Sequence, residues 1–143
     1  MNNLIISRIM QGLTFLFGRY KNEWNLEINA FLNKNEFAIF QNMGRYDKIH
    51  SYKIYKKVKC NKILKNNMLF YKLSLLHDCG KENYSIFRRV KKVLIGDKKL
   101  ENHSIDGFEK LKNINIELAH LIGQHHDETE NIEMLEFQRL DSE

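Results

Sequence analysis

Residues 75–82 read LLHDCGKE, an apolar run followed by a histidine, an aspartate and, two residues later, a glycine. Leu69 and Leu73 precede this run at helical spacing, so a helix that buries leucines is expected to end at His77 and Asp78. Burying an imidazole or a carboxylate without a partner costs several kcal/mol. The pair is therefore expected either to face water or to hold something such as a metal ion.

Helices are expected throughout the chain. The 143 residues include no proline, and no segment alternates apolar and polar residues as a half-buried strand does. Apolar residues make up 43% of the chain and aromatic residues 11%, which is enough for a core. We therefore predict an all-α fold in a single domain, because this length is ordinary for one domain.

The predicted helices have recognisable ends. Asn33 and Glu36 have the spacing of a capping box, Gly44 closes that helix, and Asp47 can cap the next. Gly80 stands where a left-handed C-cap would end the helix of residues 69–77. Apolar spacing predicts further helices at 86–94, which is basic, at 103–111, at 115–126 and from about 131 to 141.

The N-terminal segment 5–20 is predicted to be an amphipathic helix with Ile9, Leu13, Phe17 and Tyr20 on one stripe. Such a helix could dock on a membrane surface, but packing on its own domain is the favoured interpretation. No run of about 18 apolar residues and no small-residue cleavage site occurs, so we expect no membrane span and a cytoplasmic protein.

The formal charge of +5 includes denser basic patches at residues 53–65 and 88–99. Such patches could attract nucleic acid or an anionic substrate, although solvated helix faces explain most runs of this kind. The sequence contains no nucleic-acid recognition motif and no series of aromatic residues for base stacking. Nucleic acid is therefore a possible partner but not the favoured one.

Most of the histidines share one kind of position. Five of the six lie at predicted helix ends or in line with an apolar stripe, and two aspartates lie on the same kind of face: His50, His77, His103, His125 and His126, with Asp78 and Asp141. Imidazole and carboxylate are the usual ligands of Mn, Fe, Co, Ni and Zn. The pattern predicts a divalent transition-metal site, and His120 is left as structural.

The order of these residues resembles a known family. His50 in YDKIHS, His77 and Asp78 in LLHDCGK, and Asp141 in FQRLDSE resemble the signature of the HD-domain metal-dependent phosphohydrolase superfamily. The resemblance covers about residues 37–141. It implies a helical bundle of the HD type as the core, with residues 1–32 as a helical extension packed on it.

A second part of the pattern resembles HD subgroups with two metals, including the HD-GYP phosphodiesterases. It consists of His103 in NHSIDG and the pair His125 and His126 in GQHHDE. No Gly-Tyr-Pro follows that pair, so the chain looks more like the small stand-alone HD proteins of bacteria. Cyclic dinucleotides are accordingly not the expected substrates.

The resemblance implies roles for these residues. His50, His77, Asp78 and Asp141 would hold one ion, and Asp78 would bridge to a second ion held by His103, His125 and His126. An ion bound by both the Asp78 carboxylate and a histidine ring requires that histidine to lie close to Asp78. His103, and at least one of His125 and His126, should therefore lie within roughly 5 Å of Asp78.

The resemblance also implies a reaction. The chain would hydrolyse a phosphomonoester or phosphodiester, with a nucleotide-like small molecule as the expected substrate. Asp78 and Lys81 are the predicted catalytic residues, and Lys81 and Arg45, with Arg88 and Arg89 as further candidates, would contact phosphate. The alternative is an HD-fold scaffold that binds a nucleotide or a protein without turnover.

Overall fold

The computed structural model describes residues 2–81 and 102–143, and every regular element within these residues is a helix. The elements are α1 (Asn2–Phe17), α2 (Trp24–Asn29), α3 (Lys34–Asn42), α4 (Arg45–Cys60), α5 (Met68–Leu76), the 3₁₀ helix η1 (Cys79–Lys81), α8 (His103–Leu111), α9 (Ile116–Gln124) and α10 (Ile132–Ser142). The all-α prediction is confirmed. The predicted helix at 86–94, with Arg88 and Arg89, lies outside the described residues.

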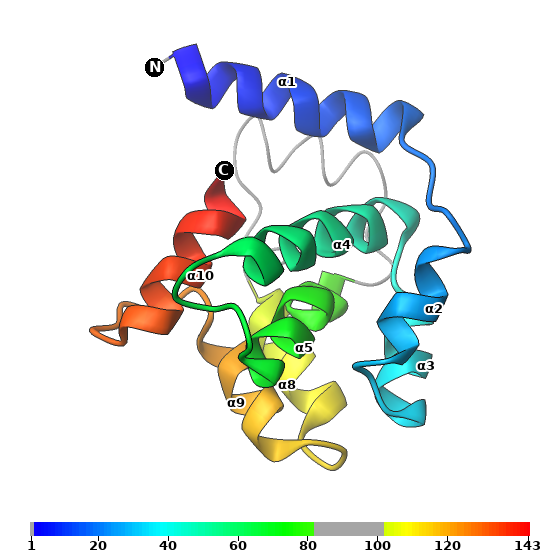
Figure 1. Ribbon diagram of the computed structural model, residues 1–143, viewed down its shortest axis with the longest axis vertical. Helices are drawn as coiled ribbons and strands as arrows, with labels where there is room; N and C mark the ends of the chain where they lie inside the picture. The colour runs from blue at the N-terminus through cyan, green and yellow to red at the C-terminus, as the bar shows by residue number, and fades with distance from the viewer. Residues whose placement is uncertain (1, 82–101) are drawn as a thin grey trace.

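Helices α4 and α5 form the middle of the molecule. Helix α4 packs on α5 and α10, α5 packs on α3 and α9, and α8 packs on α9 and η1. Figure 1 shows α1 running along one end, beside α4, while α8 and α9 lie at the opposite end. Large buried side chains fill the core between the helices, among them Phe40, Tyr55, Leu73, Leu75 and Phe137.

Asparagines begin several helices. The capping box is present: the Asn33 side chain accepts from the Glu36 N–H, and the Glu36 carboxylate accepts from the Asn33 N–H. The prediction that Asp47 caps α4 is wrong, because Gly44 is extended and the helix already begins at Arg45. Asp47 instead lies buried in the first turn of α4.

Gly80 has a different role from the predicted one. Its backbone is not left-handed, and it lies so close to α8 that a Cβ would overlap the carbonyl of His103. Gly107 is similarly constrained, because a Cβ there would lie 2.6 Å from Cγ2 of Ile122. Gly80 allows η1 and α8 to approach closely, which brings His103 next to the end of α5, and Gly107 allows α8 to pack closely on Ile122 of α9.

A helix forms near the N-terminus, but it spans Asn2–Phe17 and not residues 5–20, so Tyr20 lies outside it, where it packs against the core. The rest of the predicted apolar stripe does not face the core. Ile9, Leu13 and Phe17 are 57%, 45% and 74% exposed. The residues that α1 turns toward α4 include Ser7 and Gln11 instead. Large apolar side chains occupy nearly every face of α1, so hydrophobic spacing alone could not identify the inner one.

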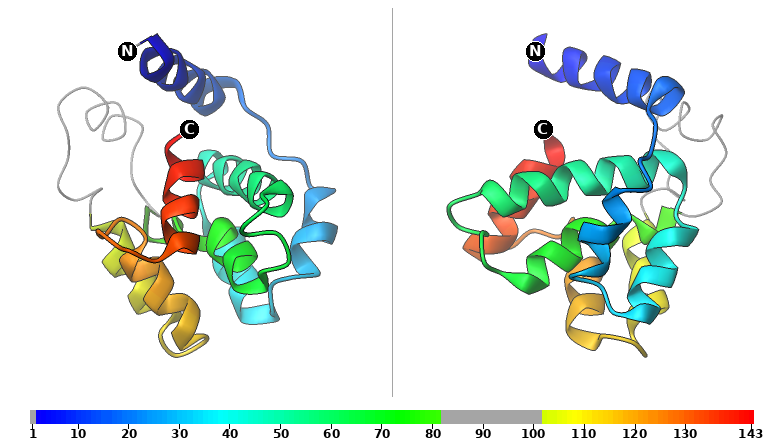
Figure 2. Two further views of the ribbon diagram at one scale, coloured as in Figure 1. Left: turned by 60° about the vertical axis from the view of Figure 1, so that its left-hand side comes forward. Right: turned by 45° about the vertical axis from the view of Figure 1, so that its right-hand side comes forward.

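Helix α1 and the residue that follows it touch the rest of the described chain at Ser7 and at Gly18. The Ser7 hydroxyl donates to the backbone carbonyl of Glu143 at 3.0 Å, and Gly18, just after the helix, lies against Ile49 of α4. Figure 2 shows α1 above α4 and the C-terminus from two further sides. None of the helices in the described residues is both long and apolar enough to cross a membrane.

Candidate metal centre

Three helices bring the first group of candidate ligands together. His77 follows the last residue of α5, His50 lies on α4, and Asp141 lies in the last turn of α10. Oδ1 of Asp141 lies 3.0 Å from Nε2 of His50 and 3.1 Å from Nε2 of His77. We call these three residues the first cluster; their ligand atoms all lie within 4.8 Å of one another.

The second group comes from α8 and α9. His103 begins α8, and His125 and His126 follow the last residue of α9. Nε2 of His103 lies 3.3 Å from Nε2 of His125 and 3.1 Å from Nε2 of His126. We call these three residues the second cluster, and their ligand atoms also lie within 4.8 Å of one another.

Asp78 lies between the two clusters. Its Oδ1 is 3.3 Å from Nε2 of His103, in the second cluster. Its Oδ2 is 3.5 Å from Nε2 of His77 and 4.0 Å from Nε2 of His50, in the first cluster. One carboxylate therefore faces both groups, and the distance to His103 is inside the 5 Å limit expected from the sequence.

Backbone carbonyls determine which ring nitrogen faces the centre. Nδ1 of His77 donates to the carbonyl of Ser74 at 2.9 Å, and Nδ1 of His125 donates to the carbonyl of Ile122 at 2.5 Å. A carbonyl can only accept, so both Nδ1 atoms carry hydrogen. A histidine that keeps its hydrogen on Nδ1 can offer Nε2 as the electron-pair donor when it binds a metal, which is the arrangement of a metal-binding histidine.

The two clusters differ in their electrostatics. Burial lowers the pKa of His77, but the charges of Asp78 and Asp141 outweigh burial and raise it to about 9. Burial, helped by the charges of neighbouring histidines, lowers the pKa of His125 to about 3. The first cluster thus attracts positive charge, while His125 in the second stays neutral at pH 7 and can donate an electron pair.

The donor set fits a bound metal. Oδ2 of Asp78 is buried and has no hydrogen-bond donor among the described residues. The Nε2 atoms of the three histidines in the second cluster point at one another, so all three could bind one ion. Imidazole nitrogens with carboxylate oxygens are the ligands of Mn, Fe, Co, Ni and Zn. All seven predicted ligands meet at this place.

Two further charged residues lie at the centre. Nζ of Lys81 is 3.1 Å from Oδ1 of Asp78. Burial lowers the pKa of Lys81, but the charges of Asp78 and the buried Asp47 outweigh this and raise it. Sequence reasoning treated Asp47 only as a helix cap, although its position three residues before His50 places it on the same helix face. Arg45 is exposed in the first turn of α4, and its predicted phosphate contact stays a prediction.

A cavity of about 410 Å³ opens beside the first cluster, between α1 and α4. Tyr46, His50, Lys53 and Lys57 line its α4 side. Sequence reasoning missed the role of these lysines, although they lie three and seven residues after His50, a spacing that places all three on one helix face. The other wall belongs to α1, which was expected to pack on the domain, although no signal in the sequence placed it against α4.

Comparison with known families gives one match. Residues 45–141 match the HD domain, a stretch that includes the seven candidate ligands and most of the chain. Searches of curated proteins and of solved structures found no match. The HD domain is an all-α fold of metal-dependent phosphohydrolases, in agreement with the helices and the histidine and aspartate clusters described above. The chain therefore belongs to the HD domain family.

Proposed function

We propose that this protein is a metal-dependent phosphohydrolase that holds two divalent transition-metal ions. His50, His77 and Asp141 would bind one ion, His103, His125 and His126 would bind the other, and Asp78 would contact both. The observation that carries the proposal is the position of Asp78, whose Oδ1 faces His103 and whose Oδ2 faces His50 and His77. Ions held by these residues would act as Lewis acids, which would lower the pKa of a bound water and offset the negative charge of phosphoryl oxygens.

The chain's own residues prepare the site for an anionic substrate. Asp78 stays ionised, because the charges of His77 and Lys81 outweigh burial and hold its pKa well below the usual range. Burial also raises the pKa of Asp141, but His77 and the hydrogen bond from His50 bring it well below that range. Both carboxylates are therefore negative at pH 7 and can hold cations.

Lys81 is the candidate for a direct phosphate contact. Its side chain is 24% exposed while Asp78 is 2% exposed, so Lys81 extends from the buried carboxylate toward solvent. Its raised pKa keeps it cationic. A cation at that position can hold a phosphoryl oxygen and stabilise the charge that develops during attack. We therefore assign Asp78 and Lys81 the catalytic roles predicted from the sequence.

The test combines metal analysis with turnover. The full chain is purified without a metal-binding tag, and its Mn, Fe, Co, Ni and Zn contents are measured. Hydrolysis of p-nitrophenyl phosphate and of bis-p-nitrophenyl phosphate is then assayed with each of these metals supplied. We expect about two metals per chain and activity that a chelator removes.

Two results would overturn the proposal. A folded protein that binds none of these metals would exclude the assigned ligands. A protein that binds two metals but hydrolyses neither ester, nor any of a broader panel of phosphate esters, would instead be the non-catalytic scaffold considered from the sequence.

A further inference from the structure

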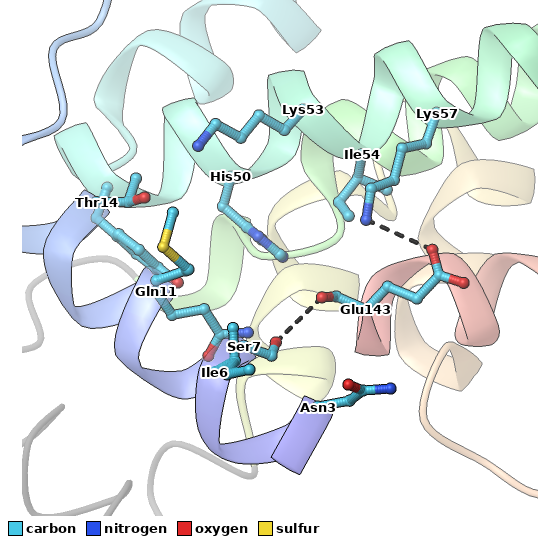
Figure 3. A pocket seen from close by; sticks show the side chains of 12 residues that line it. Asn3, Ile6, Ser7, Gln11, Thr14, His50, Lys53, Ile54, Lys57 and Glu143 are labelled. Atoms are coloured by element: carbon cyan, nitrogen blue, oxygen red, sulfur yellow. Dashed lines mark hydrogen bonds and ion pairs between the residues drawn. The ribbon is translucent and has the colours of Figure 1, made fainter.

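The side chains of α1 are arranged in the opposite way to those of an ordinary surface helix. Ser7, Gln11 and Thr14 are half-buried and line the cavity between α1 and α4, and Figure 3 shows them on the side of α1 that borders this cavity. Eight large apolar side chains of α1 are between 45% and 74% exposed: Leu4, Ile5, Ile6, Ile9, Met10, Leu13, Leu16 and Phe17. A helix that packs on its own domain normally buries its apolar stripe and leaves its polar stripe in water.

The polar and the apolar residues form two stripes on opposite sides of the helix. Ser7, Gln11 and Thr14, which we call the inner stripe, are spaced four and three residues apart, as one helix face requires. A second set, which we call the outer stripe, has the same spacing: Ile5, Ile9, Leu13 and Leu16. Each residue turns an α-helix by about 100°, so Ile9 points about 200° away from Ser7. The outer stripe therefore faces away from the domain.

The position of Gly12 agrees with this orientation. Gly12 lies beside the outer stripe, and a Cβ added there would meet no atom of the described residues within 4 Å. The contacts that attach α1 to the domain lie elsewhere: the Ser7 hydroxyl donates to the carbonyl of Glu143, and Gly18 lies against Ile49. The described part of the chain thus holds α1 without covering its outer stripe.

Basic residues accompany the outer stripe. Arg8 lies one residue after Ser7 and one before Ile9, so it points about 100° from both stripes, at the border between them. Arg19 and Lys21 follow the helix, and all three basic side chains are exposed. Residues 1–22 contain no aspartate and no glutamate. The segment that carries the apolar surface is therefore entirely cationic in its charge.

We propose that α1 docks the protein on the surface of a membrane that contains anionic lipids, with the outer stripe between the headgroups and the acyl chains. A helix with an apolar face and neighbouring basic residues binds such surfaces, because apolar burial and attraction to anionic headgroups act together. Helix α1 stays on the domain through its inner stripe, so it would lie in the plane of the membrane. The proposal goes beyond the phosphohydrolase function and does not depend on it.

A second copy of this chain is a less suitable partner for the outer stripe. Two copies packed through α1 would bring Arg8, Arg19 and Lys21 of one chain near those of the other, and residues 1–22 offer no carboxylate to pair with them. Like charges placed against one another disfavour an interface. Anionic headgroups supply the opposite charge, so the charge of the segment favours the membrane.

Binding is tested by flotation of the full-length chain with lipid vesicles. The vesicles are phosphatidylcholine alone, or phosphatidylcholine with about 30% phosphatidylglycerol, whose headgroups attract basic residues near the surface. We expect the protein to bind the anionic vesicles at least about 10-fold more tightly than the neutral ones. Raising the salt to about 0.5 M should weaken this binding, because salt screens exposed charges.

One pair of variants tests the apolar contribution. Ile9→Ser combined with Leu13→Ser removes apolar surface from the outer stripe and should weaken binding to the anionic vesicles about 10-fold or more. The matched control is Ile105→Ser combined with Ile132→Ser, because these residues are 60% and 68% exposed outside α1. All four side chains are exposed, so the core is undisturbed, and the control should change binding less than about 2-fold.

A second pair tests the charge. Arg8→Glu reverses the charge at the border of the two stripes and should weaken binding to the anionic vesicles about 10-fold, with little effect on the neutral vesicles. Lys62→Glu is the control, an equal change of net charge at an exposed lysine of the loop after α4. Its effect should be clearly smaller, because attraction to the headgroups falls off with distance from the surface.

Fluorescence tests insertion of the outer side of α1. Trp24 is the one tryptophan of the chain and is stacked on Tyr52, so its emission should not change when vesicles are added. Phe17→Trp places a second tryptophan at the most exposed of the eight apolar positions of α1. Its emission should shift to shorter wavelength with the anionic vesicles, since the ring moves from water into an apolar surrounding.

Several results would overturn the proposal. They are absence of binding to the anionic vesicles, equal binding to both kinds of vesicle, and equal effects of the α1 pair and its control pair. Self-association in analytical ultracentrifugation that Ile9→Ser with Leu13→Ser abolishes, without vesicle binding, would assign the outer stripe to a second copy. An active phosphohydrolase that does not bind vesicles refutes docking alone, whereas vesicle binding without hydrolysis refutes the proposed function alone.

Discussion

Two polar sites in this molecule each contain a buried carboxylate, Glu36 in one and Asp78 in the other, and they differ in how their atoms are paired. One of them, which we call the Glu36 site, is centred on the fully buried side chain of Glu36, which lies on α3 and contacts Lys72 of α5. Its oxygens accept from the Asn33 N–H at 2.9 Å, from Nζ of Lys72 at 2.8 and 3.0 Å, and from Nδ2 of Asn115 at 3.0 Å. The Glu36 carboxylate has a counter-charge and a donor for each oxygen, so the Glu36 site requires no bound ligand.

At the candidate metal centre, by contrast, not every buried polar atom has a hydrogen-bond partner among the described residues. Three imidazole nitrogens of the second cluster face one another, and Oδ2 of Asp78 has no donor in the described part of the chain. Buried polar atoms ordinarily have partners, because leaving one unpaired costs about 1–3 kcal/mol. The comparison teaches that the lack of a donor to Oδ2 of Asp78 within residues 2–81 and 102–143, rather than burial or charge, distinguishes the candidate metal centre from the Glu36 site.

The largest effect is expected from a substitution of Asp78, which lies between the two clusters of the candidate metal centre. Asp78→Asn keeps the volume of the side chain but removes the charge that faces both clusters, so turnover should fall by about 10³-fold or more, with loss of metal. The measurement is phosphate-ester hydrolysis together with elemental analysis. Asp106→Asn is the control, since Asp106 is exposed on α8. Parental activity in Asp78→Asn would exclude the catalytic assignment.

A smaller but more selective effect is expected at the second cluster. His103→Ala removes the imidazole that lies within 3.3 Å of Asp78, His125 and His126. Metal content should drop from about two ions per chain to one, and activity should fall at least about 10²-fold. His120→Ala is the matched control, because His120 is exposed and contacts Phe108 instead. Undiminished metal content in His103→Ala would leave only a one-metal interpretation.

The fold class and most helix ends could be predicted because local signals determine them. Asn33, Asn115 and Asn131 cap α3, α9 and α10 through hydrogen bonds to nearby N–H groups, and such bonds depend only on residues a few positions apart. Gly80 was misread because its reason is long-range: it makes room for His103, which is 23 residues away. No local pattern contains that information.

The candidate ligands could be predicted because their residue types and order carry the signal, whereas their neighbours could not. Lys53 was read as part of a basic patch, and only the approach of α1 makes it part of a cavity. Likewise, Asp47 was read as a cap until its burial beside the metal centre was visible. The division into residues 1–32 and 37–141 stays a prediction.

A substitution at the Glu36 site should lower the free energy of unfolding and leave the phosphohydrolase activity unchanged. Glu36→Gln leaves Lys72, whose side chain is only 18% exposed, without its counter-charge, and should destabilise the fold by about 3 kcal/mol. Urea unfolding measures this loss, while activity per folded molecule should stay at the parental value.

The paired substitution checks that explanation. Lys72→Met in the Glu36→Gln background removes the unpaired charge and should restore part of the lost stability, because no buried cation then remains. If the double variant is less stable than Glu36→Gln, the loss comes from the capping box and not from the ion pair.

The smallest effect is expected at Glu27, another carboxylate whose oxygens are paired with donors but which lies nearer the surface. The carboxylate of Glu27 accepts from the hydroxyl of Tyr52 at 2.8 Å, from that of Tyr55 at 2.9 Å and from Nζ of Lys59 at 2.8 Å. Burial raises the pKa of Glu27, but these three donors outweigh burial and lower it from 4.5 to about 2. The ionised form is therefore the one that the folded protein favours.

A lowered carboxyl pKa stabilises the fold above the unfolded value and loses that contribution as the pH falls through the folded value. The contribution of Glu27 should thus be complete above pH 4.5 and disappear between pH 4.5 and about 2. Because the side chain is 26% exposed, solvent screening limits it to about 1–2 kcal/mol. Urea unfolding of the chelated parent and of Glu27→Gln measures it, since the acid titration of Asp78 and Asp141 is common to both proteins and cancels in the difference. A stability difference that stays constant from pH 7 to pH 3 would show that the tyrosines bind the Glu27 side chain equally well without its charge.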